Sequence, residues 1–398
     1  MLDFKIYAPI NVPINWQSEL ITDSEQRYKL LKKFFSSIPL IDIKPNNWLM
    51  GYGSLEHDYL PDLYQPAAVI TLNELSKEDD IKHADLYVYD NCLAILYVGL
   101  TVDSDIAHID DLAISQRIEL LSQQYISPIL EQFYTIKTTY PLIEPSKYKF
   151  FNNDHAELTN AKPLWVARML TQNKSLSSEH YTNWIKNIDV QTDLLQLGSG
   201  NSLLRKEECF SDVHRIMVMS QFHAALMYRI EELLKGNLKK FNSNHYNESS
   251  STPLSSYLAA QQYRNDHIEY INIQVSAASS GVQGRRRELL QQFHKAWGGE
   301  EQRERIAQLV NLTQMRIDRL FQDKLRQQNR SMQTLLGFLG SLGLISLVID
   351  LINIEREVTH NDTMGLLDLV HMISSENFLS STVIIVVFFT LYFYKSHE

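Results

Sequence analysis

The chain has 398 residues, of which 37 are Lys or Arg and 47 are Asp or Glu, so its formal net charge is -10. This balance argues against a protein that coats nucleic acid, because phosphate binding requires concentrated Lys and Arg, and we expect no direct nucleic-acid binding. Cys92 and Cys209 are the two cysteines of the sequence. So few cysteines argue against a disulfide framework and are typical of a reducing compartment.

Residues 1–209 are predicted to form a cytoplasmic domain of mixed α and β structure. Residues 85–102 consist of two β-rich runs on either side of Asp90 and Asn91, a pair that favours the turn of a hairpin. Apolar residues at helical spacing then run from Ile114 to Tyr125. We expect Pro128 to end or bend that helix.

Two further strand regions are predicted in this domain, at residues 163–171 and 193–204. The second region is expected to be a hairpin that turns at Gly198–Asn201. Its glycine-rich segment is also similar to the turn of a Rossmann-type S-adenosylmethionine site. We favour the hairpin, because a second strand rather than a helix follows the glycines and no acidic residue stands at the expected distance.

Residues 210–333 are predicted to form a region of long helices. The first helix should cover Asp212–Lys235 and end at Gly236, and the second should open at Thr252 and Pro253 and run to Ala278. A third helical region should begin at Arg285, be interrupted at Gly298 and Gly299, and continue from Glu300 without a break into the first apolar run near the C-terminus. Its apolar positions have a spacing near 3.5, which suits either self-association or packing against the chain's own domain: Ile306, Val310, Thr313, Ile317 and Leu320.

Two apolar runs close together, residues 334–354 and 378–394, lie near the C-terminus. Runs of about 17 to 25 mainly apolar residues can span a bilayer as helices. We therefore expect two transmembrane helices joined by an extracytoplasmic loop, 355–377, and followed by a cytoplasmic tail, 395–398. A buried hairpin within a soluble domain is the alternative.

The charges beside these runs predict the topology. Basic residues precede the first run and follow the second, whereas the intervening loop is mainly acidic, and Lys and Arg remain on the cytoplasmic side. Both termini should then face the cytoplasm, in a multi-pass protein of the bacterial inner membrane whose partner is the lipid bilayer. The basic residues are Arg316, Arg319, Lys324, Arg326, Arg330 and Lys395.

This order of elements resembles the superfamily of CorA magnesium channels and ZntB transporters. Three segments are similar to parts of that family: Asp85–Val98, Gln327–Gly337 and the C-terminal Tyr392–Glu398. The family signature Gly-Met-Asn is absent, and the sequence reads DLINIE from Asp350 to Glu355 where it would stand. The resemblance implies an α+β cytoplasmic domain followed by long helices and two C-terminal transmembrane helices, assembled as a homopentamer.

The resemblance also implies a pore lined by the first apolar run. Its small residues would let helices approach closely, although such residues also occur in ordinary helix pairs. Asp350 would form a ring of carboxylates that favours cations, or would simply reach the outer interface. The candidate pore-lining residues are Gly337, Gly340, Ser341, Gly343, Ser346 and Asp350.

An acidic loop offers a candidate metal site. Its four carboxylates and one imidazole are able to hold Mg²⁺ or another divalent cation. The alternative is an ordinary loop in which Asp110 caps the following helix. The candidate ligands are Asp103, Asp105, His108, Asp110 and Asp111.

These features lead to two functional hypotheses. The first is a CorA-like homo-oligomeric channel gated by its cytoplasmic domain, which is either a divergent divalent-cation channel or an effector of CRISPR-type antiviral defence triggered by a nucleotide second messenger. The second is a membrane-tethered sensor or scaffold without a pore, responding to a small-molecule or nucleotide ligand. No catalytic motif with a nucleophile and its base is evident, so we do not predict an enzyme, and no cofactor beyond a cation is expected.

Overall fold

The computed structural model describes residues 1–14, 33–38, 42–44, 66, 68–89, 91–103, 106–137, 155–172, 178–242, 254–357, 377, 380–384 and 386–387. The chain divides into two compact units, Met1–Gln314 and Met315–Glu398. The boundary falls inside one long helix, later than the predicted end of the α/β domain at residue 209. The first two long helices therefore belong to the same unit as the sheet.

Among the described residues of the first unit, nine strands form one sheet. The sheet has the order β2-β3-β4-β5-β1-β6-β9-β8-β7, and β6 and β9 run parallel while the other paired neighbours are antiparallel. The strands are β1 (Leu2–Asn11), β2 (Asp42–Lys44), β3 (Ala68–Thr71), β4 (Ile81–Val88), β5 (Leu93–Val102), β6 (Ala167–Thr171), β7 (Ile188–Gln191), β8 (Leu195–Gly198) and β9 (Asn201–Leu204).

Both predicted hairpins are confirmed. β4 and β5 pair in antiparallel register, and between them Asn91 and Cys92 have φ values of 60° and 58°, while Asp90 lies outside the described residues. Positive φ at two successive residues matches the twist of flanking strands in a tight hairpin. β8 and β9 form the second hairpin, so the glycine-rich segment is a strand turn rather than the start of a helix.

Helices cover both faces of this sheet and create two apolar cores. One core contains side chains from α2 (Asp111–Tyr125), α3 (Ser127–Lys137) and α5 (Ser178–Ile185), and the short α4 (His155–Thr159) contacts α3. Alternate β1 residues such as Phe4 and Ile6 point into this core, as strand geometry requires. The predicted helix from Ile114 to Tyr125 is therefore confirmed, and it ends just before Pro128.

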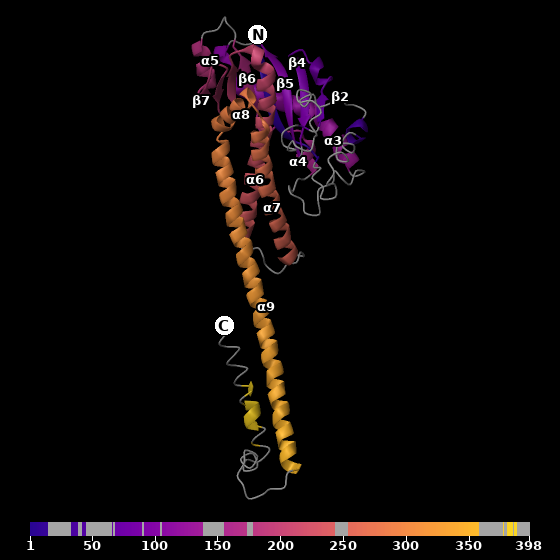
Figure 1. The fold of residues 1–398 in the computed structure, drawn as a ribbon. Coiled ribbons are helices and arrows are strands. Elements are labelled where there is room, and N and C mark those ends of the chain that lie inside the picture. Colours follow the sequence, from indigo (N-terminus) through magenta and orange to yellow (C-terminus); the bar gives the residue numbers. More distant parts are fainter. Residues whose placement is uncertain are drawn as a thin grey trace. The chain divides into compact units, whose positions relative to one another are not determined.

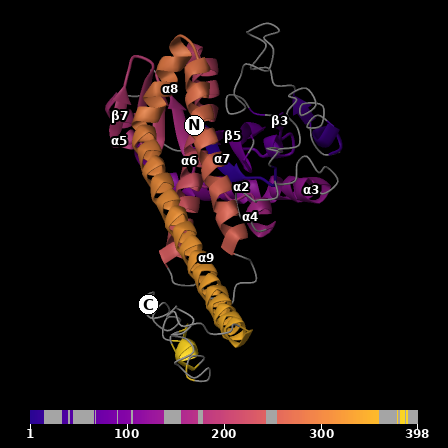
Figure 2. The ribbon, with the colours of Figure 1, turned by 60° about the horizontal axis from the view of Figure 1, so that its bottom comes forward.

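The other core lies between the sheet and α6 (Phe210–Asn242), α7 (Leu254–Gly281) and α8 (Arg285–Ala296). In Figure 1, α3 and α4 lie to the right of α6, α7 and α8, and Figure 2 shows the same elements after a turn of 60°. The predicted end of α6 at Gly236 is wrong, because the helix continues to Asn242. Packing of the apolar α6 stripe outweighs the roughly 1 kcal/mol cost of one helical glycine. Thr252 and Pro253, the predicted start of α7, lie outside the described residues.

The last described long helix, α9, runs from Gly299 to Glu357. It confirms the prediction of one continuous helix that begins near Glu300 and includes the first apolar run. It follows Gly298, whose φ of 61° separates it from α8. Within α9, Ile306, Val310 and Thr313 are buried inside the first unit, so this part packs against its own domain.

The expected transmembrane helices are not found. Among the described residues, no helix has the combination of length and mean hydropathy needed to cross a bilayer. Residues 334–354 are part of the 59-residue helix α9, which is polar and charged over most of its length before this run. Of residues 378–394, only 380–384 and 386–387 are described. The predicted two-span fold and multi-pass inner-membrane location are corrected accordingly.

Gly198 has a steric role in the β8–β9 hairpin. A Cβ atom there would lie 2.7 Å from the backbone oxygen of Asn187 and 2.8 Å from Cγ2 of Ile185. We expect Gly198→Ala to lower the free energy of unfolding by about 1–3 kcal/mol, because neither backbone nor a packed side chain can easily yield. Urea titration measures this loss. Gly200→Ala is the matched control, because a Cβ there would meet only Arg168 Nη1 at 4.0 Å; equal losses would contradict the steric explanation.

Candidate functional site

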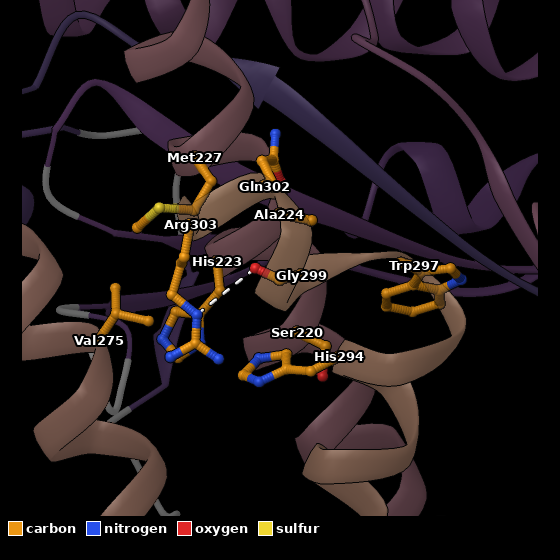
Figure 3. A pocket seen from close by; sticks show the side chains of 10 residues that line it. All are labelled: Ser220, His223, Ala224, Met227, Val275, His294, Trp297, Gly299, Gln302 and Arg303. Carbon is orange, nitrogen blue, oxygen red and sulfur yellow. Dashed lines mark hydrogen bonds between the residues drawn. The ribbon is translucent and has the colours of Figure 1, made fainter. Parts of the chain in front are cut away.

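A pocket in the first unit lies where α6, α7, α8 and the start of α9 meet. Its volume is about 20 Å³, and Figure 3 shows the side chains around it. A volume of this size holds roughly one water molecule or a monatomic ion. Ten residues line it: Ser220, His223, Ala224, Met227, Val275, His294, Trp297, Gly299, Gln302 and Arg303.

Two histidines and one arginine give the pocket its polarity. His223 on α6 is only 2% exposed, and its ring centroid lies 5.9 Å from that of His294 on α8. Burial, followed by the nearby His223 and Arg303, lowers the pKa of His294 to about 3. The His294 imidazole is therefore neutral at pH 7, and the local field opposes any further positive charge.

Arg303 reaches the pocket from the first turns of α9. Its Nε donates to the backbone oxygen of Gly299 at 3.4 Å, the bond drawn in Figure 3. No ion pair joins Arg303 to a carboxylate in the described part of the chain. Nearby Glu231 is held instead by Lys235 at 3.0 Å and Arg305 at 3.4 Å. The pocket is thus lined by an arginine and contains no carboxylate among its lining residues.

Gly299 allows the helices to meet closely at this pocket. A Cβ atom at Gly299 would lie 3.3 Å from the backbone oxygen of His294, which is tighter than ordinary contact. The glycine thus brings the start of α9 against α8, with His294 and Arg303 beside the same space. Gly298 and Gly299 appear in the sequence only as a helix break, and neither His294 nor Arg303 forms part of a recognisable motif.

A second polar cluster lies between the sheet and α6. His214 Nδ1 lies 2.9 Å from the hydroxyl of Tyr7, and its Nε2 lies 2.8 Å from the hydroxyl of Tyr87. Tyr97 packs edge-on against the same ring at 4.5 Å between centroids. Burial lowers the pKa of His214 to about 4, and burial also raises the pKa of Tyr97 to about 12. Both ring nitrogens have partners, so the cluster can act as a polar anchor between α6 and the sheet.

The residues of the predicted acidic metal site have separate structural roles. Asp110 caps α2 by accepting from the backbone N–H groups of Leu112 and Ala113 at 2.9 and 3.1 Å, the alternative that the sequence left open. Asp103 lies 3.9 Å from the N-terminal amine, and His108 ends the short 3-10 helix Ile106–His108. Asp105 lies outside the described residues.

Asp111 forms the centre of a network rather than an open ligand position. It accepts hydrogen bonds from Trp184 Nε1 at 3.1 Å and from Asn201 Nδ2 at 2.8 Å, and it lies 3.5 Å from Arg168 Nε. These contacts tie α2 to α5, β9 and β6. In the part of the chain that the structure describes, no group of three or more metal-binding side chains is found. Divalent-cation binding by this loop stays a prediction.

The predicted pore-lining residues all lie on α9 in the second unit. At about 100° per residue, Gly337, Gly340 and Ser341 fall on one side of the helix. Gly343, Ser346 and Asp350 fall on the opposite side, so the six residues form two stripes rather than one face. A Cβ at any of the three glycines would meet nothing within 4 Å in the described structure. Their lining of a pore stays a prediction.

A second set of positions on α9, which shares Ser346 with the first, is more regular. Its residues are spaced alternately by four and three positions, the heptad pattern of a coiled coil. Seven of the nine are apolar, and these are between 43% and 60% exposed. We call this surface the α9 stripe: Phe321, Leu325, Gln328, Met332, Leu335, Leu339, Leu342, Ser346 and Ile349.

The stripe continues the buried positions that lie earlier in α9. From Ile306 the spacing is 4, 3, 4, 4 and 4 residues to Leu325, which amounts to one extra residue in the heptad pattern before the regular heptads begin. The predicted positions from Ile306 to Ile317 agree with this pattern, but the next one, predicted at Leu320, lies one residue later, at Phe321. The three successive spacings of four were the available signal.

No protein-family model, curated protein sequence or solved structure matches this chain. The resemblance to the CorA and ZntB superfamily therefore stays a prediction.

Proposed function

We propose that the protein is a homo-oligomeric sensor, in which the unit Met1–Gln314 carries the ligand site and α9 joins several copies through a parallel helical bundle. The observation that supports this most directly is the α9 stripe, where apolar residues at heptad spacing are exposed. A contiguous exposed apolar surface of this kind is typical of an interaction site. A second copy of the same helix fits it, because heptads on both partners interdigitate as knobs into holes.

The residues beside the stripe favour more than two copies. Between Phe321 and Thr334, every position outside the stripe is polar. From Leu335 onward, Leu336 and Phe338 flank the stripe, and both are more than half exposed. Apolar residues at flanking positions widen the surface, so each helix has room for two neighbours. Cyclic symmetry follows in a closed assembly, and five copies is the number that the CorA resemblance implies.

Ion conduction and triggering by a nucleotide messenger stay predictions from the resemblance. The multi-pass membrane location that accompanied them is not part of this proposal. In the proposed assembly, the unit that binds the ligand and the helix surface that joins the copies lie in different parts of the chain, as expected for a sensor.

A cross-linking experiment tests the bundle. Gln328 is a polar position within the stripe, whereas Arg330 lies on the opposite side of α9. Both native cysteines are buried. A cysteine introduced on the exposed surface of α9 is therefore the thiol that a cross-linking reagent reaches in the folded protein. With a short bismaleimide, we expect Gln328→Cys to yield covalent dimers of the full chain and Arg330→Cys to yield few.

Native mass spectrometry of the unmodified protein gives the number of copies. Three or more copies, together with cross-linking selective for position 328, support the proposal. Equal cross-linking at both positions contradicts the parallel stripe. A monomer that co-floats with phospholipid vesicles would mean that lipid covers the apolar residues of α9, and it would overturn the proposal.

A further inference from the structure

The pocket between α6 and α9 has a charge distribution suited to one class of ligand. Arg303 supplies a fixed positive charge, and His223 and His294 supply imidazole nitrogens from two other helices. The lining contains no Asp or Glu, and the two carboxylates of the first α9 turn, Glu300 and Glu301, are exposed to solvent. An anion would therefore meet the positive charge of Arg303 and the polar imidazoles of two other helices, with no carboxylate in the lining.

The same geometry disfavours a cation. His223 and His294 alone could provide two nitrogen ligands, but transition-metal sites in proteins usually need three or four. Among the described residues no third histidine, cysteine or carboxylate completes such a set. The guanidinium of Arg303 lines the same space and would repel a metal ion.

The size of the pocket limits the anion. A volume of about 20 Å³ accommodates a single small ion or one corner of a larger group. We propose that the pocket binds a small inorganic anion of halide size, held by the Arg303 guanidinium with His223 and His294 as polar neighbours. This site deepens the proposed sensor function by naming the charge class of its ligand, although binding itself does not require oligomerisation.

Bromide provides a direct probe. Crystals of the full chain grown or soaked in sodium bromide should show an anomalous peak beside Arg303. In solution, chloride should raise the melting temperature of the wild type more than sodium gluconate at equal ionic strength, because gluconate is too large for the cavity. We expect Arg303→Gln to weaken chloride affinity at least tenfold, and Arg303→Lys to retain part of the affinity by keeping the charge.

The matched control is Arg287→Gln, which removes the same charge from an exposed position on α8 outside the pocket. It should preserve the chloride effect. A bromide peak without an Arg303-dependent effect in solution would show binding at crystal concentration only and overturn the proposal, as would chloride stabilisation unchanged in Arg303→Gln. The chloride test and the bundle test can be told apart. Arg303→Gln should lose chloride binding while the protein stays oligomeric, whereas a wrong bundle would show itself in the cross-linking at position 328.

Discussion

Replacing Leu335 and Leu339 together with aspartate should dissociate the oligomer into monomers. Each fully buried leucine contributes about 2 kcal/mol, so the four leucines of one helix pair contribute about 8 kcal/mol to that contact. Buried carboxylates facing each other add repulsion. The apparent dissociation constant should rise by several orders of magnitude, since each 1.4 kcal/mol is a factor of ten. Light scattering during gel filtration measures the change.

The control for this experiment adds the same charges elsewhere on α9. Gln327→Asp with Gln333→Asp places two carboxylates outside the stripe, where both native side chains are exposed. The control variant should keep the oligomer of the wild type. The aspartates at Leu335 and Leu339 should leave the unfolding of the first unit unchanged, because both positions lie in the second unit. An intact oligomer in the Leu335 and Leu339 variant would refute the stripe as the interface.

Acid should destabilise the fold through its buried histidines. The unfolded chain protonates a histidine near pH 6.5, whereas His214 in the folded protein has a pKa of about 4 because it is buried. Between these values the unfolded state binds more protons, so stability falls as pH falls. At pH 5 the loss from His214 alone is about 2 kcal/mol relative to pH 7.5. His267 and His294 have pKa values lowered in the same direction by burial, so their losses add.

Urea titrations at pH 7.5 and pH 5.0 isolate the contribution of His214. His214→Gln should be less stable at both pH values, because Tyr7 and Tyr87 lose their ring partner. Its additional loss on acidification should be about 2 kcal/mol smaller than that of the wild type. Asp85, His83 and Lys5 also act on His214 and remain in the variant. His180→Gln, at an exposed position, should keep the pH dependence of the wild type; identical pH dependence in both variants would exclude His214 as a source.

Helices and hairpins were predictable from the sequence where neighbouring residues supply a turn signal or a regular spacing of apolar side chains. The Asn91 hairpin, the helix before Pro128 and the β8–β9 turn each depend on neighbouring residues, and the structure has them all. The order of strands was not predictable, because β1 pairs with β5 and β6, which are distant in sequence. The end of α6 was misjudged for a related reason, since tertiary packing outweighs one glycine.

The candidate site was less predictable than the fold. His223 lies among the buried apolar residues of α6 and resembles a core residue in the sequence, while His294 and Arg303 belong to other helices. Only the folded chain brings these three residues to one pocket. The acidic loop is the converse case, because its residues are close in sequence but do not form one site. Asp110 caps a helix, and Asp111 contacts Arg168, Trp184 and Asn201.

The hydrogen bonds of His214 make its two tyrosine partners inequivalent. A neutral imidazole has one N–H and one lone pair, so one hydroxyl donates to the ring while the other accepts from it. If the proton resides on Nδ1, Tyr7 accepts and Tyr87 donates; if it resides on Nε2, these roles reverse. A change of tautomer would therefore turn both hydroxyl dipoles at once, from β1 to β4, without moving a heavy atom. Nitrogen chemical shifts of the ring would report which of the two orientations the folded protein holds.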